Sequence, residues 1–141
     1  MSFLADAALQ KTLVERLNTN EAFQTQAAVF DGSVLLEVDD DKLWLKIYRG
    51  QVIDHDAQVP AFGYTFKFSG PEEHWQYLLS GRKTWADLTF PGKRYFDDDP
   101  GLSRLGELSV DIATEGNLLE AGRLTEAMFE LAYTLRDVAS K

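Results

Sequence analysis

The chain has 141 residues, of which 45% are hydrophobic and 26% charged, so intrinsic disorder is excluded and one domain, residues 1–141, is expected. Its net charge of −9 would repel nucleic acid, the lack of cysteine excludes disulfide and thiolate chemistry, and no apolar run is long enough for a membrane span. Because the N-terminus also lacks a secretory signal pattern, these features together predict a cytoplasmic protein.

The N-terminal segment is expected to be helical. Leucines recur at four-residue intervals in segment 6–17, which places them on one face of a helix. The polar stretch 18–20 favours a turn, and a second short helix is predicted over 21–28.

Strands are expected next, because apolar and polar residues then alternate with a period of two and aromatic and β-branched residues are frequent. Short polar turns separate the first runs, so hairpins are predicted. The expected strands are the segments near 27–38, 42–48, 51–55, 63–69 and 107–112.

After the fourth strand the spacing changes to that of a helix. Pro71 followed by two glutamates is typical of a helix start, and Gly81 is a plausible stop. Segment 84–105 mixes aromatic and acidic residues and indicates no clear element, whereas 118–138 is predicted to be one long helix. This order predicts an α+β fold with a five-stranded, mainly antiparallel sheet and helices over one face.

Motifs of catalysis and metal binding are absent or weak. The sequence has no nucleophile elbow, phosphate-binding loop, dinucleotide-binding motif or zinc-protease motif. His55 stands between two aspartates, where it could act as an oriented base, but a polar turn explains it more simply. His74 is expected at a solvated helix start. The acidic runs 39–41 and 97–99 fit turns and lack the ligand spacing of a calcium loop, so neither a metal nor a cofactor is predicted.

Aromatic residues are the informative feature, since they make up 12% of a small chain. Most of them are expected in the core, and some are expected to line an apolar cavity of the kind that holds small molecules. Met128 has the same two interpretations, because a flexible thioether suits both a core and an adaptable pocket.

Several strings then resemble a known family. Segments 30–38 (FDGSVLLEV) and 43–47 (LWLKI) resemble the opening hairpin of the sterol carrier protein type 2-like family. Segment 64–75 (YTFKFSGPEEHW) is similar to its strand-into-helix step, and 106–110 (GELSV) looks like its late strand. The resemblance covers about residues 27–138.

The resemblance implies a sterol-carrier-like sheet covered by helices, with an apolar tunnel between them that takes lipids, fatty acyl chains or sterols. Two features depart from the family pattern. Segment 84–105 is longer and more aromatic and acidic than the short helix of the family, and the last residues, ASK, are not the peroxisomal SKL signal.

We therefore predict an apolar cavity between the sheet and the helices. The aromatic face of the fourth strand needs a cover, and the amphipathic segments 71–80 and 118–138 are available to form it. The cavity is predicted to be lined by some of Phe66, Phe68, Trp75, Leu79, Trp85, Leu119, Met128 and Ala132.

The expected function is the binding or carriage of an apolar small molecule in that cavity. The alternative is a small enzyme, or an enzyme subunit, that uses a carboxylate of raised pKa in an apolar cavity. A plain interaction subunit, with a protein partner or as a homodimer, is a third possibility. Whether a carboxylate lies inside the cavity discriminates the first two.

Overall fold

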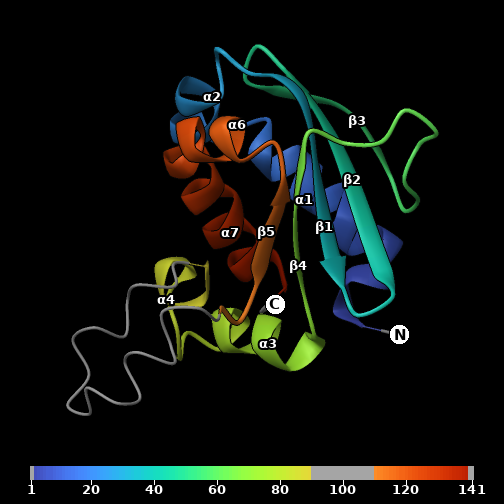
Figure 1. Ribbon diagram of the computed structural model, residues 1–141, viewed down its shortest axis with the longest axis vertical. Helices are drawn as coiled ribbons and strands as arrows, with labels where there is room; N and C mark the ends of the chain where they lie inside the picture. The colour runs from blue at the N-terminus through green and yellow to red at the C-terminus, as the bar shows by residue number, and fades with distance from the viewer. Residues whose placement is uncertain (1, 90–109, 140–141) are drawn as a thin grey trace.

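The computed structural model describes residues 2–89 and 110–139 (Figure 1). None of the helices in these two ranges is long and apolar enough to cross a membrane. In chain order the elements are the 3-10 helix η1 (Phe3–Ala5), α1 (Ala7–Leu17), α2 (Glu21–Gln26), β1 (Asp31–Val38), β2 (Asp41–Tyr48), β3 (Gln51–Asp56), β4 (Phe66–Gly70), α3 (Glu72–Leu79), α4 (Trp85–Thr89), β5 (Ala113–Gly116), α6 (Leu118–Arg123) and α7 (Thr125–Ala139).

Local sequence explains where the helices start. Asp6, Asn20 and Asn117 each precede a helix, and each side chain accepts a hydrogen bond from backbone N–H groups of the first turn. Pro71 stands at the start of α3, and two glutamates occupy its first turn, where they complement the helix dipole. The predicted helices at 6–17, 21–28 and 71–80 are thereby confirmed, with small differences at their ends.

The strands form one five-stranded sheet in the order β3-β2-β1-β4-β5. Neighbouring strands are antiparallel except for the central pair, β1 and β4, which is parallel. The predicted α+β class and the mainly antiparallel sheet are confirmed. Because β1 lies at the centre, it is buried on both faces, which is why five successive residues of it are buried.

One face of the sheet carries the main core. The register aligns Val34 with Phe66 and Leu36 with Phe68, and these side chains join the apolar cluster that the helices complete. Helix α7 contacts α1, α2 and α3, and Figure 1 shows α1 and α7 on the same side of the sheet. The helices therefore cover one face of the sheet, as predicted.

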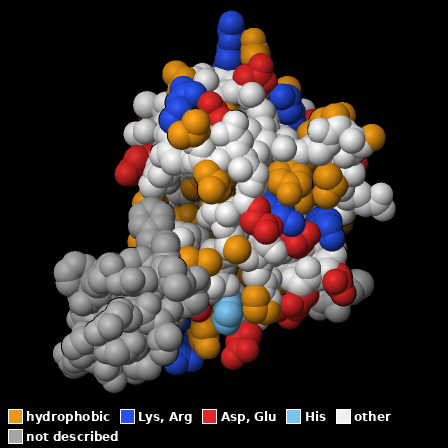
Figure 2. Space-filling view, in the orientation of Figure 1, with side chains coloured by type: hydrophobic (Ala, Val, Ile, Leu, Met, Phe, Trp, Pro, Cys, Tyr) orange, Lys and Arg blue, Asp and Glu red, His pale blue; other side chains and the backbone are white. Residues whose placement is uncertain are grey.

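The opposite face of the sheet is more polar. Glu37 on β1 lies 3.6 Å from the Lys67 amine on β4, and the same amine lies 3.2 Å from Glu115 on β5. Figure 2 shows acidic and basic side chains interleaved on the visible surface. Leu35 and Trp44, which stand opposite each other in the pairing of β1 with β2, are apolar exceptions, 1% and 3% exposed. Trp44 also packs edge-on against Phe62 at a centroid separation of 5.7 Å.

The fifth strand starts later than predicted. Of the expected segment 107–112, residues 107–109 lie outside the described residues, and 110–112 are not in a strand. The backbone N–H groups of Asp111 and Ile112 both donate to the Leu88 carbonyl, at 3.0 Å each, so neither is available to a sheet ladder. Pairing with β4 begins only at Ala113.

The C-terminal segment is two helices rather than the one predicted. Leu124 separates α6 from α7 with φ −102° and ψ 18°, outside the helical region. The Thr125 hydroxyl donates to the Gly122 carbonyl at 2.8 Å, an acceptor that a continuous helix would offer to a backbone N–H four residues on. The break lets α6 turn away from the axis of α7 and lie over β4 and β5, which it contacts.

Candidate functional site

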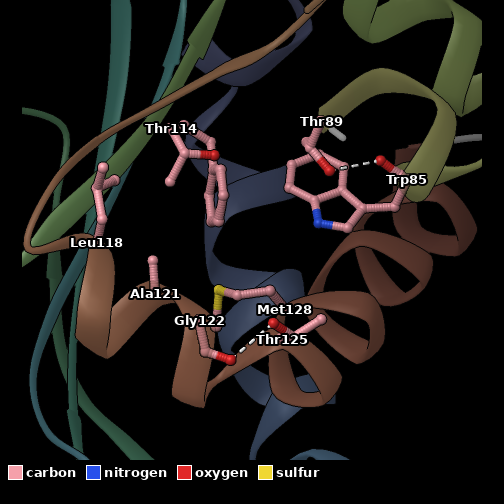
Figure 3. A pocket seen from close by; sticks show the side chains of 9 residues that line it. Trp85, Thr89, Thr114, Leu118, Ala121, Gly122, Thr125 and Met128 are labelled. Carbon is pink, nitrogen blue, oxygen red and sulfur yellow. Dashed lines mark hydrogen bonds between the residues drawn. The ribbon is translucent and has the colours of Figure 1, made fainter. Parts of the chain in front are cut away.

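A pocket of about 170 Å³ lies where β4, β5, α4, α6 and the start of α7 meet (Figure 3). Its walls therefore come from the sheet and from helices on both sides of segment 90–109 in the chain. The lining residues are Phe68, Trp85, Thr89, Thr114, Leu118, Ala121, Gly122, Thr125 and Met128.

Aromatic rings form the inner wall. The rings of Phe68 and Trp85 meet edge to face with their centroids 4.9 Å apart. Behind them, Phe66 packs on Phe68 at 5.7 Å and Trp75 packs on Trp85 at 5.7 Å. Such pairs stabilise a core beyond the area they bury, so this wall is held in place from both the strand and the helices.

Helix α6 forms the outer wall. Leu118, Ala121 and Gly122 follow one another at i, i+3 and i+4, the spacing of one helical face, and all three line the pocket together with Thr125, the first residue of α7. Ala121 and Gly122 are small, which leaves room between α6 and Met128. Leu118 is 60% exposed while it also lines the pocket, so it marks the mouth.

The polar groups of the described lining residues are few and neutral. The Thr89 hydroxyl donates to the Trp85 carbonyl and the Thr125 hydroxyl to the Gly122 carbonyl, each at 2.8 Å. Thr114 stands directly opposite Phe68 in the pairing of β4 with β5. None of the described lining residues has a titratable side chain.

Three of the eight residues predicted to line a cavity do line this pocket: Phe68, Trp85 and Met128. Phe66, Trp75 and Ala132 are fully buried in the core behind it, and Leu79 is partly buried against that core. The structure thus brings these residues into one region, but only the first three face the open space. Their role in ligand binding stays a prediction.

Leu119 is placed differently from the prediction. It is 83% exposed and does not line the pocket, whereas its neighbour Leu118 does. Adjacent residues of a helix point about 100° apart, so only one of the two leucines can face the sheet.

Most of the outer wall was missed from the sequence, although a signal for it existed. The lining residues Ala121 and Gly122 share the helical face of Leu118, but the prediction of one long helix gave the segment a single continuous face. Thr89 and Thr114 had no signal in the sequence, because only the folded chain brings α4 and β5 together.

The histidines and acidic runs form no comparable site. His74 Nδ1 lies 2.7 Å from the Asp111 carbonyl oxygen, and His55 is exposed on β3. Asp41 accepts a hydrogen bond from the Ser2 backbone N–H, and this bond is the main reason why its pKa is lowered. Within residues 2–89 and 110–139, no group of three or more His, Asp or Glu side chains is placed to hold a metal ion. The acidic run 97–99 lies outside the described residues.

Comparison with known proteins identifies the fold. No protein-family model matches the sequence, and no curated protein matches it. The structure is similar to the crystal structure of sterol carrier protein 2, with a TM-score of 0.64 and 19% identity over 92% of this chain and 95% of that one. It is equally similar to a conserved hypothetical protein of Thermus thermophilus, suggested to be a sterol carrier protein, with a TM-score of 0.64 and 20% identity over 96% of this chain and 90% of that one. At this identity the likeness shows the fold, and the fold that the sequence resemblance implied is confirmed.

Proposed function

We propose that this chain, which has the sterol carrier protein 2-like fold, binds an apolar small molecule of the lipid class in the pocket beneath α6. The observation that carries the proposal is the pocket itself, a space of about 170 Å³ lined by aromatic, aliphatic and small side chains with no titratable group among the described lining residues. Concave, mostly apolar sites with a few neutral polar groups are the usual form of small-molecule sites.

The size of the pocket limits how a ligand sits in it. An engineered apolar cavity of about 150 Å³ takes up benzene, so a space of this size holds a ring or a short stretch of chain. A whole sterol or long acyl chain exceeds it. We expect one end of the ligand to lie between Phe68 and Met128, and the remainder to leave past Leu118, the exposed residue at the mouth.

The chemistry of the lining supports binding over the catalytic alternative. An enzyme of the kind considered from the sequence needs a carboxylate inside the cavity, and the described walls offer only hydroxyl, thioether and hydrocarbon groups besides one indole. For a fatty acyl ligand of about 20 heavy atoms, about 0.3 kcal/mol per atom gives a dissociation constant of tens of micromolar.

The proposal is tested by a substitution on α6 that fills the pocket with a larger side chain. Figure 3 shows the Ala121 side chain pointing from α6 toward the pocket, so Ala121→Phe is expected to occupy the space and reduce the binding of a fluorescent fatty acid at least tenfold. Leu119→Phe is the matched control, because it places the same ring on the same helix outside the pocket and should leave binding unchanged. The measurement is a fluorescence titration, with circular dichroism to show that both variants are folded.

Two outcomes would contradict the proposal. The wild-type protein could take up neither a fluorescent fatty acid nor a fluorescent sterol, or Ala121→Phe and Leu119→Phe could bind the probe equally well.

A further inference from the structure

The Trp85 indole N–H is a polar group of the pocket that the described residues leave without a partner. Trp85 is only 2% exposed, yet its indole N–H makes no hydrogen bond to any of them. Trp75, which packs against it, differs in this respect, because its Nε1 donates to the Glu37 carbonyl at 3.2 Å. Figure 3 shows the Trp85 ring at the wall of the pocket, with its nitrogen on the edge nearest Met128.

The other polar groups of the pocket do not take this proton. The Thr89 and Thr125 hydroxyls are turned toward helix carbonyls of their own segments, to which they donate. The Thr114 hydroxyl has no hydrogen bond within the described residues, and Figure 3 shows it directed into the pocket. The described lining residues therefore present a ligand with one group that can only donate, the indole N–H, and one hydroxyl that can donate or accept.

The Trp85 nitrogen is not among the fully buried atoms without a partner, so solvent reaches it from the pocket and water satisfies its N–H when no ligand is bound. A ligand that displaces the water without replacing its hydrogen bond loses affinity. A carboxylate would supply an acceptor, but no lysine, arginine or histidine is among the described lining residues to balance its charge. The matching group is thus an uncharged acceptor.

We infer that the pocket selects apolar ligands that place an uncharged oxygen acceptor, a carbonyl, ether or hydroxyl, on the Trp85 indole N–H, in the space that the Thr114 hydroxyl also lines. The inference rests on the proposed function, since it concerns the ligand of the same pocket. It makes Trp85 a specificity-determining residue in addition to a wall residue.

Three probes of nearly equal shape test the inference: acetophenone, which has a carbonyl; cumene, which has a hydrocarbon branch in its place; and benzoate, which has a charged carboxylate. Each contains one ring, the size that a cavity of this volume holds. Their affinities are measured by calorimetry for the wild type, for Trp85→Phe, and for Trp44→Phe, the control on the opposite face of the sheet.

Trp85→Phe keeps an aromatic ring and removes the donor. We expect this substitution to reduce the affinity for acetophenone about fivefold, the effect of losing one neutral hydrogen bond, and to change the affinity for cumene by less than about twofold. Trp44→Phe should change the affinity for neither acetophenone nor cumene. Of the three probes, benzoate should bind the wild type most weakly.

A direct signal comes from the indole N–H resonances in a ¹H–¹⁵N spectrum, one for each of the three tryptophans. The resonance that is missing in Trp85→Phe should move downfield when acetophenone is added to the wild type, and should not do so with cumene. This readout distinguishes a hydrogen bond from a change in packing.

The outcomes separate the two proposals. If acetophenone and cumene bind but lose affinity equally in Trp85→Phe, and the resonance shifts alike with both, the inference is overturned and the pocket remains a binding site. If none of these three probes binds the wild type, the inference is overturned. If the fluorescent fatty acid and the fluorescent sterol also fail to bind, the proposed function is overturned with it.

Discussion

Two buried tryptophans differ in whether their indole N–H group has a hydrogen-bond partner. Trp75 and Trp44 are both buried, but the indole N–H of Trp75 donates to the Glu37 carbonyl, whereas that of Trp44 has no partner. Among the described residues, Trp44 Nε1 is the one fully buried side-chain nitrogen or oxygen that has no hydrogen-bond partner. Its contact with Phe62 supplies packing and leaves the donor unsatisfied.

We predict that Trp75→Phe lowers the free energy of unfolding more than Trp44→Phe does. The two substitutions remove the same volume, but the first also breaks a hydrogen bond and strands a carbonyl, while the second removes an unsatisfied donor. The difference should be about 1–3 kcal/mol. Urea denaturation monitored by circular dichroism measures it, and equal losses in the two variants would show that the hydrogen bond does not matter.

At the scale of elements, three glycines occupy sites of different constraint. Gly50, in the β2–β3 hairpin, has φ +80°, and a Cβ there would lie 2.5 Å from the Gln24 backbone oxygen. Gly81, after α3, has φ +79° but nothing within 4 Å of such an atom. Gly122 lies within α6, where a Cβ would also meet nothing within 4 Å. Gly50 is therefore constrained by close approach and by its backbone conformation, Gly81 by its backbone conformation alone, and Gly122 by neither.

Alanine at these three positions should therefore have three different effects on stability. Gly122→Ala should raise the free energy of unfolding by about 0.5–1 kcal/mol, because alanine favours a helix interior. Gly81→Ala should lower it by about 1–2 kcal/mol through the left-handed backbone. Gly50→Ala should lower it further, since the hairpin would also have to move away from α2. Thermal unfolding of the three variants gives the order, and a Gly50→Ala loss no greater than that of Gly81→Ala would contradict it.

At the scale of the whole molecule, a falling pH has two opposite effects on stability: it weakens the repulsion between like charges, and it removes the favourable interactions of particular carboxylates. Protonation of carboxylates reduces the net charge of −9 and with it the general self-repulsion. Glu37 acts in the other direction. Its burial raises its pKa, but the Ser69 hydrogen bond and the charges of Lys67 and Lys42 outweigh burial, so the pKa lies below the usual 4.5.

A depressed pKa in the folded state means that Glu37 stabilises the fold above about pH 4.5, and that this contribution is lost as the pH falls through its folded pKa. We predict that Glu37→Gln is less stable than the wild type at pH 7 and that the difference shrinks toward about pH 3. Urea denaturation across this range measures the difference. A difference that stays constant with pH would show that the charge of Glu37 contributes nothing.

Lys67 should show the opposite dependence. Burial lowers its pKa, but the hydrogen bond with Glu115 and the negative charge of Glu37 outweigh burial, so the pKa is raised above 10.5. Its contribution is fully present below pH 10.5 and is lost as the pH rises through its folded pKa.

The sequence by itself determined the class of this fold. Period-two alternation, the spacing of leucines in α1 and the start of α3 at Pro71 are local signals, and local propensity and patterning were enough to predict them. Phe68, Trp85 and Met128, which the sequence predicted to line a cavity, do line the pocket, because large apolar residues on amphipathic elements have to be buried together. Their role in binding stays a prediction.

Only the tertiary structure decided which side chains face open space and which fill the core. The Leu88 carbonyl, by taking two N–H groups, moves the start of β5 to Ala113 and sets Thr114 opposite Phe68. The break at Leu124 turns α6 so that Leu118 rather than Leu119 covers the pocket. Both outcomes depend on contacts between segments far apart in the chain, and a local pattern does not record such contacts.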